Sequence, residues 1–166
     1  MKNTQQITPH LWFDRQAEEA AQFYVSVFKN SSIDVVSRYG KAGQEIHGMP
    51  EGLVMTMVFT LNGQKFMAIN GGPVFKFNEA ISFVITCEDQ DEIDHYWNKL
   101  TEGGDAAAQQ CGWLKDKFGV SWQVVPAKMG ELMSSGNPAK SDAVMTEMLK
   151  MKKIELGVLE EAFERG

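Results

Sequence analysis

The sequence predicts an α+β protein in which one strand–helix–three-strand unit occurs twice. The stretches ITPHLWFDRQAEEAAQFY, at 7–24, and ISFVITCEDQDEIDHYW, at 81–97, share a plan of strand, acidic break and amphipathic helix. An offset of 74 aligns Thr8 with Ser82, and a pattern that returns at such a period indicates two copies of one supersecondary unit. Each copy is expected to bury one apolar face.

The first unit is predicted to occupy residues 1–78. Its first strand alternates so that Thr8, His10 and Trp12 share one face. Asp14 is the predicted N-cap of the helix that follows, because apolar residues recur at helical spacing behind it. Three further strands are predicted over 33–39, 53–61 and 64–69.

Two connections in this unit carry clear turn signals. Asn62-Gly63 is typical of a hairpin, since both residues accept positive φ. The stretch 40–52 contains four glycines and His47, and it is predicted to be a loop with His47 in solvent. That loop is either a lid over a site or a mobile segment.

The second unit is predicted over residues 79–126, with its first strand at 79–87. Asp89 and Glu92 form a capping box at the start of its helix. A weakly patterned segment, 105–110, takes the place of the next strand. The final hairpin pairs 112–117 with 120–125 across Phe118-Gly119. An offset of 56 aligns Gly63 with Gly119, because the first unit has the longer loop.

The remainder, residues 127–166, is predicted to be a helical C-terminal extension and not a third copy. Asn137 is a predicted N-cap, and Pro138 occupies the first helical position that proline favours. A final short helix follows. This extension is expected to pack either on the sheet or on a second subunit.

Composition narrows the possible partners and compartment. A formal charge of −6 over 166 residues argues against nucleic acid and against anionic membrane surfaces. The opening residues contain no apolar signal-peptide region, and no hydrophobic run is long enough to span a bilayer. Cys87 and Cys111 stand apart, as expected for reduced thiols in a cytoplasmic protein.

Several motifs resemble one family of proteins. The tandem units, together with ITPHLWFDRQAEEAAQFY, FMAINGGPVFKFNEAISF, CGWLKDKFGVSWQVVP and MLKMKKIEL, resemble the vicinal-oxygen-chelate superfamily of glyoxalases, bleomycin-resistance proteins and dioxygenases. Within it they resemble the PhnB-like branch labelled 3-demethylubiquinone-9 3-methyltransferase. The resemblance covers about residues 7–159 and implies cupped sheets with helices on the convex side, around a pocket, in a homodimer.

The resemblance also implies where a metal would bind in the catalytic members of the superfamily. The four positions fall on Thr8, Met67, Ser82 and Gln123 in this sequence. Hydroxyl, thioether and amide groups are poor ligands for zinc or iron, which favour imidazole and carboxylate. No metal or other cofactor is therefore predicted; the alternative is a divalent metal held by a relocated set such as His10 with Glu79.

The methyltransferase label has no support in the residues. S-adenosylmethionine enzymes of the common type need a doubly wound sheet with a glycine-rich loop between a strand and a helix. The glycine pair Gly71-Gly72 is followed by Pro73 and not by a predicted helix.

Ten residues are candidates for the lining of a ligand pocket: Thr8, His10, Trp12, Met57, Met67, Asn70, Glu79, Ser82, Trp113 and Gln123. His10 is either an acid–base group or a hydrogen-bonded wall residue. Asn70 lies either at the pocket mouth or in a backbone turn. The Trp and Met side chains either line a cavity or fill a closed core. Cys111 is read as a buried, inert thiol.

These observations predict a protein that binds a small aromatic or hydrophobic molecule without a metal. The alternative is a divalent-metal-dependent lyase, isomerase or dioxygenase of the same superfamily.

Overall fold

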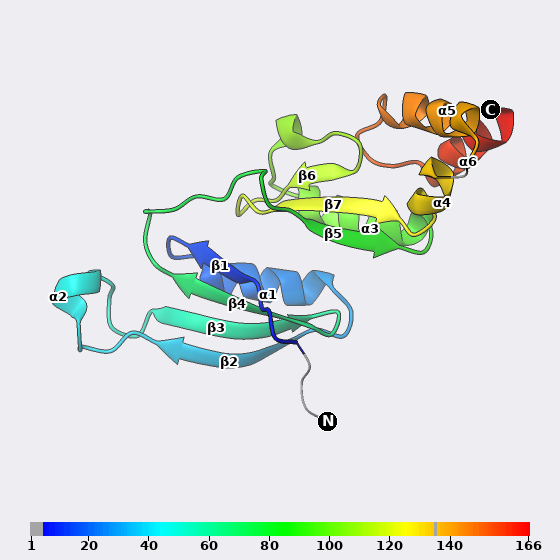
Figure 1. Cartoon of the computed structure of the whole chain (residues 1–166). Coiled ribbons are helices and arrows are strands. Elements are labelled where there is room, and N and C mark those ends of the chain that lie inside the picture. Colours follow the sequence, from blue (N-terminus) through cyan, green and yellow to red (C-terminus); the bar gives the residue numbers. More distant parts are fainter. Residues whose placement is uncertain (1–4, 135) are drawn as a thin grey trace. The chain divides into compact units, whose positions relative to one another are not determined.

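The computed structural model describes residues 5–134 and 136–166, and the chain divides into two compact units, 1–77 and 78–166. Figure 1 shows the elements of each unit. The first contains β1 (His10–Phe13), α1 (Ala17–Val27), β2 (Ser32–Arg38), α2 (Gln44–His47), β3 (Val54–Leu61) and β4 (Gln64–Asn70). Its strands form one sheet in the order β1-β4-β3-β2, in which only the β1–β4 pair is parallel. The predicted strand–helix–three-strand unit is confirmed.

The core of the first unit lies between this sheet and α1, which runs along one face (Figure 1). Leu11 and Phe13 of β1 are buried on that face, as the alternation predicts. Tyr24 of α1 is fully buried and stacks on Phe59 of β3 at a centroid distance of 6.5 Å. Burying each such side chain stabilises the fold by about 1.5–3 kcal/mol.

The second unit repeats this plan with fewer strands. It contains β5 (Phe83–Cys87), α3 (Gln90–Thr101), the 3₁₀ helix η1 (Ala106–Ala108), β6 (Trp113–Lys115) and β7 (Ser121–Pro126). The sheet order is β5-β7-β6, with β5 parallel to β7. The apolar side of α3 covers one face, and Trp122 of β7 is buried on that side.

Strand register confirms the duplication residue by residue. In the first sheet His10 pairs with Met67 and Phe13 with Asn70. The offsets of 74 and 56 convert these pairs into Val84 with Gln123 and Cys87 with Pro126, and both pairs are present in the second sheet. The two parallel pairs therefore have the same register.

The main departure from the expected pattern is in the segment 105–110, where the repeat predicts a strand and the structure has none. Over 105–110 the chain forms η1 and one isolated bridge, from Gln110 to Trp113, so the described part of this sheet has three strands. The Asp105 side chain accepts a hydrogen bond from Ala107 N and so caps η1. Three successive alanines have little strand preference, which leaves this local cap to decide the conformation.

The predicted cap of the first helix is wrong. Helix α1 begins at Ala17, and the Ala17 N–H donates to Asn70 Oδ1 at 2.8 Å, not to Asp14. Asn70 ends β4, next to β1, so the sheet itself delivers the capping group. The predicted cap of α3 by Asp89 is confirmed, since Glu92 N donates to Asp89 Oδ1. The Glu92 side chain reaches back one residue further than a capping box requires, and its Oε2 accepts from Glu88 N.

The C-terminal extension contains α4 (Met129–Met133), α5 (Pro138–Met148) and α6 (Leu156–Arg165), which lie together (Figure 1). The cap by Asn137 is confirmed by its bond from Ala139 N at 3.0 Å, whereas α4 was not predicted. The extension packs on the second unit of its own chain. Cys111 N donates to Met151 O, and Gln90 binds both Ile154 O and Leu156 N through its side-chain amide.

An ion pair fastens the extension in a pH-dependent way. Lys153 Nζ lies 2.6 Å from Asp94 Oδ1, and hydrogen bonds from Lys153 and then Gln90 lower the pKa of Asp94 below 3.8. The bond to Asp94 raises the pKa of Lys153 above 10.5. Asp94 therefore contributes fully to the free energy of unfolding above about pH 4–5, and this contribution is lost as the pH falls through the pKa of Asp94 in the folded protein. The contribution of Lys153 is lost as the pH rises through the pKa of Lys153 in the folded protein.

Asp94→Asn is therefore expected to lower the unfolding temperature slightly between about pH 5 and 9, with the difference vanishing in stronger acid. The pair is partly exposed, so the loss is at most about 1 kcal/mol. Thermal unfolding of both proteins across this pH range measures it. A difference that grows as pH falls below 4 would contradict the assignment.

Candidate functional site

Each sheet has one face that the helix of its own unit does not cover, and most of the candidate residues lie there. On the first sheet the helix-free face carries a row of His10, Met67 and Val58, followed by a row of Trp12, Ile69 and Thr56. His10 is exposed, while Trp12 and Met67 are half-buried. Thr8 is half-buried just before β1, next to Pro9, whose carbonyl accepts from Met67 N. This face is apolar with few polar groups.

The Trp12 indole is held in one orientation. Its Nε1–H donates to Gly72 O at 2.9 Å, and its ring meets the edge of Phe75 at a centroid distance of 5.0 Å. A Cβ on Gly71 would overlap the indole carbons, so the ring lies directly on the glycine backbone. The glycine pair at the end of β4 therefore fixes the position of the Trp12 ring, which forms an aromatic platform on this face.

Gly71→Ala is expected to displace this platform. The new Cβ overlaps the indole, so the hydrogen bond to Gly72 O is lost and the fold is destabilised by about 1–3 kcal/mol. The Trp12 indole N–H resonance and the unfolding temperature measure both effects. Gly130→Ala is the control, because a Cβ there meets no atom within 4 Å. An unchanged Trp12 resonance in Gly71→Ala would contradict the packing of the Trp12 ring on Gly71.

The helix-free face of the second sheet is more polar. Gln123 of β7 pairs in register with Val84 of β5 and Trp113 of β6, and its Nε2 donates to Ser82 Oγ at 2.9 Å. Lys115, two residues after Trp113 on the same face, forms an ion pair with Glu79. Four of the predicted site residues, Glu79, Ser82, Trp113 and Gln123, therefore lie on or against one face of this sheet.

Two predicted site residues lie elsewhere. Met57 is only 2% exposed and faces α1 with Phe59, so it belongs to the core and not to a pocket wall. Asn70 is 0% exposed, and its side chain accepts from Ala17 N and donates to Val54 O. The predicted turn role of Asn70 is therefore wrong: its backbone does not have positive φ, and its side chain caps helix α1 from the end of β4.

The residues at the expected metal positions do not form a set of metal ligands. In the second unit Ser82 and Gln123 bind each other, and in the first the positions hold Thr8 and Met67. Across residues 5–134 and 136–166, no group of three or more His, Cys, Asp or Glu side chains is placed to hold an ion. Of the relocated set, Glu79 is already paired with Lys115.

The remaining titratable candidates have structural roles. His47 is not free in solvent: its Nδ1 accepts from Met49 N, and its ring lies 4.5 Å from that of Tyr39. Burial, together with Glu92, Asp89 and Glu88, raises the pKa of Cys87 to about 12, which keeps it a thiol. Cys111 was predicted to be buried but is half-buried. Its Sγ donates to Met148 O.

Sequence reasoning missed two buried polar residues beside the second hairpin. Asp116, 3% exposed, accepts from Phe118 N, Val120 N and Trp122 Nε1. An aspartate two residues before a turn could have signalled this role. Ser121 is 2% exposed, and its Oγ has no hydrogen-bond partner within the described residues. No pattern in the sequence points to it.

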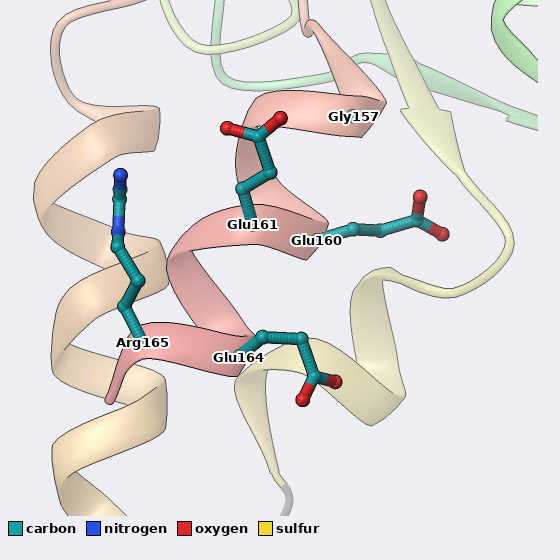
Figure 2. A pocket seen from close by; sticks show the side chains of 5 residues that line it. All are labelled: Gly157, Glu160, Glu161, Glu164 and Arg165. Atoms are coloured by element: carbon teal, nitrogen blue, oxygen red, sulfur yellow. The ribbon is translucent and has the colours of Figure 1, made fainter.

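A hollow of about 510 Å³ lies beside α6, lined by Gly157, Glu160, Glu161, Glu164 and Arg165. Figure 2 shows the three carboxylates pointing in different directions from the helix, with Arg165 directed toward another side. Glu160 pairs with Lys128 at 2.6 Å, and Glu164 lies 4.0 Å from Lys140. This hollow is a charge-paired helix surface and not a site.

The mixed sheets of the two units, each backed by a helix, have the glyoxalase and bleomycin-resistance fold. The chain belongs to the PhnB-like family described as 3-demethylubiquinone-9 3-methyltransferase, whose sequence profile matches residues 5–125. The description is a family name; the observed sheets are mixed and are not the doubly wound sheet of common methyltransferases.

Solved structures agree with this membership. The PhnB protein from Bacillus cereus is 41% identical, with a TM-score of 0.65 over 74% of this chain and 100% of its own. Protein PA1353 from Pseudomonas aeruginosa is 21% identical, with a TM-score of 0.58 over 74% and 98%. The fosfomycin resistance protein FosX from Listeria monocytogenes is 10% identical, with a TM-score of 0.54 over 81% and 99%.

The last two similarities show the fold alone. No curated protein matches the chain significantly. In the described part of the chain, every helix is too short or too polar to cross a bilayer.

Proposed function

We propose that this protein binds a small aromatic or hydrophobic molecule against the helix-free faces of its sheets, without a metal ion. The observation that supports this most is the fixed Trp12 indole beside Met67 and Ile69. A preformed aromatic platform with apolar neighbours favours planar ligands, because little ordering is needed on binding. The exposed Val35, which pairs in register with Val58 on the same face, extends the apolar area.

The donor atoms present favour a metal-free site. FosX from Listeria monocytogenes is described in complex with Mn(II) and sulfate. In this chain the four positions at which the family resemblance implies metal ligands hold hydroxyl, thioether and amide groups, which do not suit such an ion. About one divalent ion per chain in protein purified without chelator or affinity-tag metal would instead support the metal-dependent enzyme.

Isothermal titration with 1-naphthalenemethanol, a neutral aromatic probe, tests the proposal. The wild type is expected to bind saturably and Gly71→Ala at least ten-fold more weakly, while Gly130→Ala keeps the wild-type affinity. Met67→Lys, which places a charge on the same face, is expected to weaken binding by a similar factor. Absence of binding to the wild type would refute the proposal. The homodimer and the cytoplasmic location stay predictions; light scattering of the purified protein tests the first.

A further inference from the structure

Ser121 is the one buried side-chain oxygen or nitrogen without a hydrogen-bond partner in the described part of the chain. Its residue is 2% exposed, and Trp122, the next residue, faces α3. By alternation the Ser121 side chain therefore lies on the helix-free face of the second sheet. A buried hydroxyl without a partner is unfavourable, so such a group in a native protein needs an explanation.

The neighbours of Ser121 supply a cation and an aromatic ring. Ser121 pairs in register with Lys115 of β6, and Trp113 stands two residues before Lys115 on the same face. Residues two apart on a strand are separated by roughly 7 Å, which suits a ligand whose ring and charged group are directly joined. Ser82 and Gln123 lie alongside and are hydrogen-bonded to each other. Both side chains are neutral, so neither competes with the ligand for Lys115.

The Lys115 ammonium is held by a carboxylate of this same chain. Glu79 forms the ion pair, and its side chain is 60% exposed whereas that of Lys115 is 22% exposed. The hydrogen bond from Lys115 lowers the pKa of Glu79, so the partner is a carboxylate at neutral pH. The sheltered member of the pair is the cation, and an exposed ion pair contributes little stability, so another carboxylate can replace Glu79.

We propose that the helix-free face of the second sheet binds an aryl carboxylate: its ring lies on Trp113, and its carboxylate replaces Glu79 on Lys115 and accepts a hydrogen bond from Ser121. In the absence of ligand, Glu79 occupies the carboxylate position on Lys115, and it competes with the ligand for that position. This inference rests on the proposed function and narrows its ligand class to planar anions.

Two probes that share one ring system separate the inference from the proposed function. Isothermal titration compares 1-naphthoate with the neutral 1-naphthalenemethanol on the full chain. We expect 1-naphthoate to bind at least ten-fold more tightly, since hydrogen bonds to a charged group are the stronger ones. Equal affinities would overturn the carboxylate subsite alone, and binding of neither probe would overturn both proposals.

Variants assign the effect to the named residues. Lys115→Met is expected to abolish the preference for 1-naphthoate, and Ser121→Ala to reduce it. Glu79→Gln is expected to raise 1-naphthoate affinity about three-fold or more, because the competing carboxylate is removed. Lys117→Met, two residues away and exposed, is the matched control and should change nothing. Lower or unchanged 1-naphthoate affinity in Glu79→Gln would overturn the proposal even if Lys115→Met fails to fold.

Discussion

Asn70→Ala is expected to lower the free energy of unfolding by about 3 kcal/mol, the largest single effect in the first unit. The amide of Asn70 accepts from Ala17 N at 2.8 Å and donates to Val54 O at 2.9 Å. Both partners are buried main-chain groups, and each costs about 1–3 kcal/mol when left unsatisfied. The same change removes the cap of α1, whose helix covers the sheet.

Urea unfolding measures the loss, and hydrogen exchange locates it in α1 and the ends of β3 and β4. The exposed Asn78, whose Oδ1 accepts from Ala80 N two residues ahead, provides the control, with an expected change below about 0.5 kcal/mol in Asn78→Ala. Asn70→Asp keeps the acceptor but loses the donor and buries a charge, so it is expected to be no better than Asn70→Ala. A loss below about 1 kcal/mol in Asn70→Ala would show that the cap is dispensable.

Asp116→Ala is expected to destabilise the second hairpin by about 3–4 kcal/mol, because three donors lose a buried acceptor. Those donors are Phe118 N at 2.9 Å, Val120 N at 3.0 Å and Trp122 Nε1 at 2.8 Å. The carboxylate thus fixes the turn and the orientation of the Trp122 ring in the core at the same time.

Urea unfolding measures the loss of stability. Hydrogen exchange locates it, since the amides of β6 and β7 are expected to exchange faster than in the wild type. Asp91→Ala, at an exposed position in the first turn of α3, is the control with an expected change below about 1 kcal/mol. Asp116→Asn tests the charge, since it keeps the shape with only one acceptor oxygen. Retention of the Trp122 indole resonance at its wild-type position in Asp116→Ala would contradict this role.

The features that the sequence predicted correctly are those decided by nearby residues. The hairpin at Asn62-Gly63 has both residues at positive φ, and the caps at Asp89 and Asn137 bind amides two or three residues ahead. The duplication was also predictable, because both copies keep the same strand order and the same register.

The features that it missed depend on residues far apart in the chain. Helix α1 is capped from a position 53 residues away, so no local pattern could favour Asn70 over Asp14. The placement of Met57 depends on which side of β3 meets Tyr24 and Ala68, and that follows from pairing with β4. The strand expected near 105–110 was lost because a local cap outweighed a weak pattern.

The candidate site was predicted in part for the same reason. Alternation placed His10 and Trp12 on one face, and the family resemblance grouped Ser82 with Gln123. The ion pair from Glu79 to Lys115 arises because the segment before β5 lies against β6, and the burial of Ser121 is likewise a result of tertiary packing. Such contacts have no signal in the sequence of either partner.

The central claim is that the helix-free faces bind an aromatic ligand without a metal. Titration of 1-naphthoate into chelator-treated, ¹⁵N-labelled protein tests it through the four indole N–H resonances. Trp97 of α3 and Trp122 of β7 are buried and act as internal references. We predict saturable shifts of the Trp12 and Trp113 resonances, with little change in those of Trp97 and Trp122. Shifts that occur only after a divalent metal is added, or no shifts at all, would contradict the account.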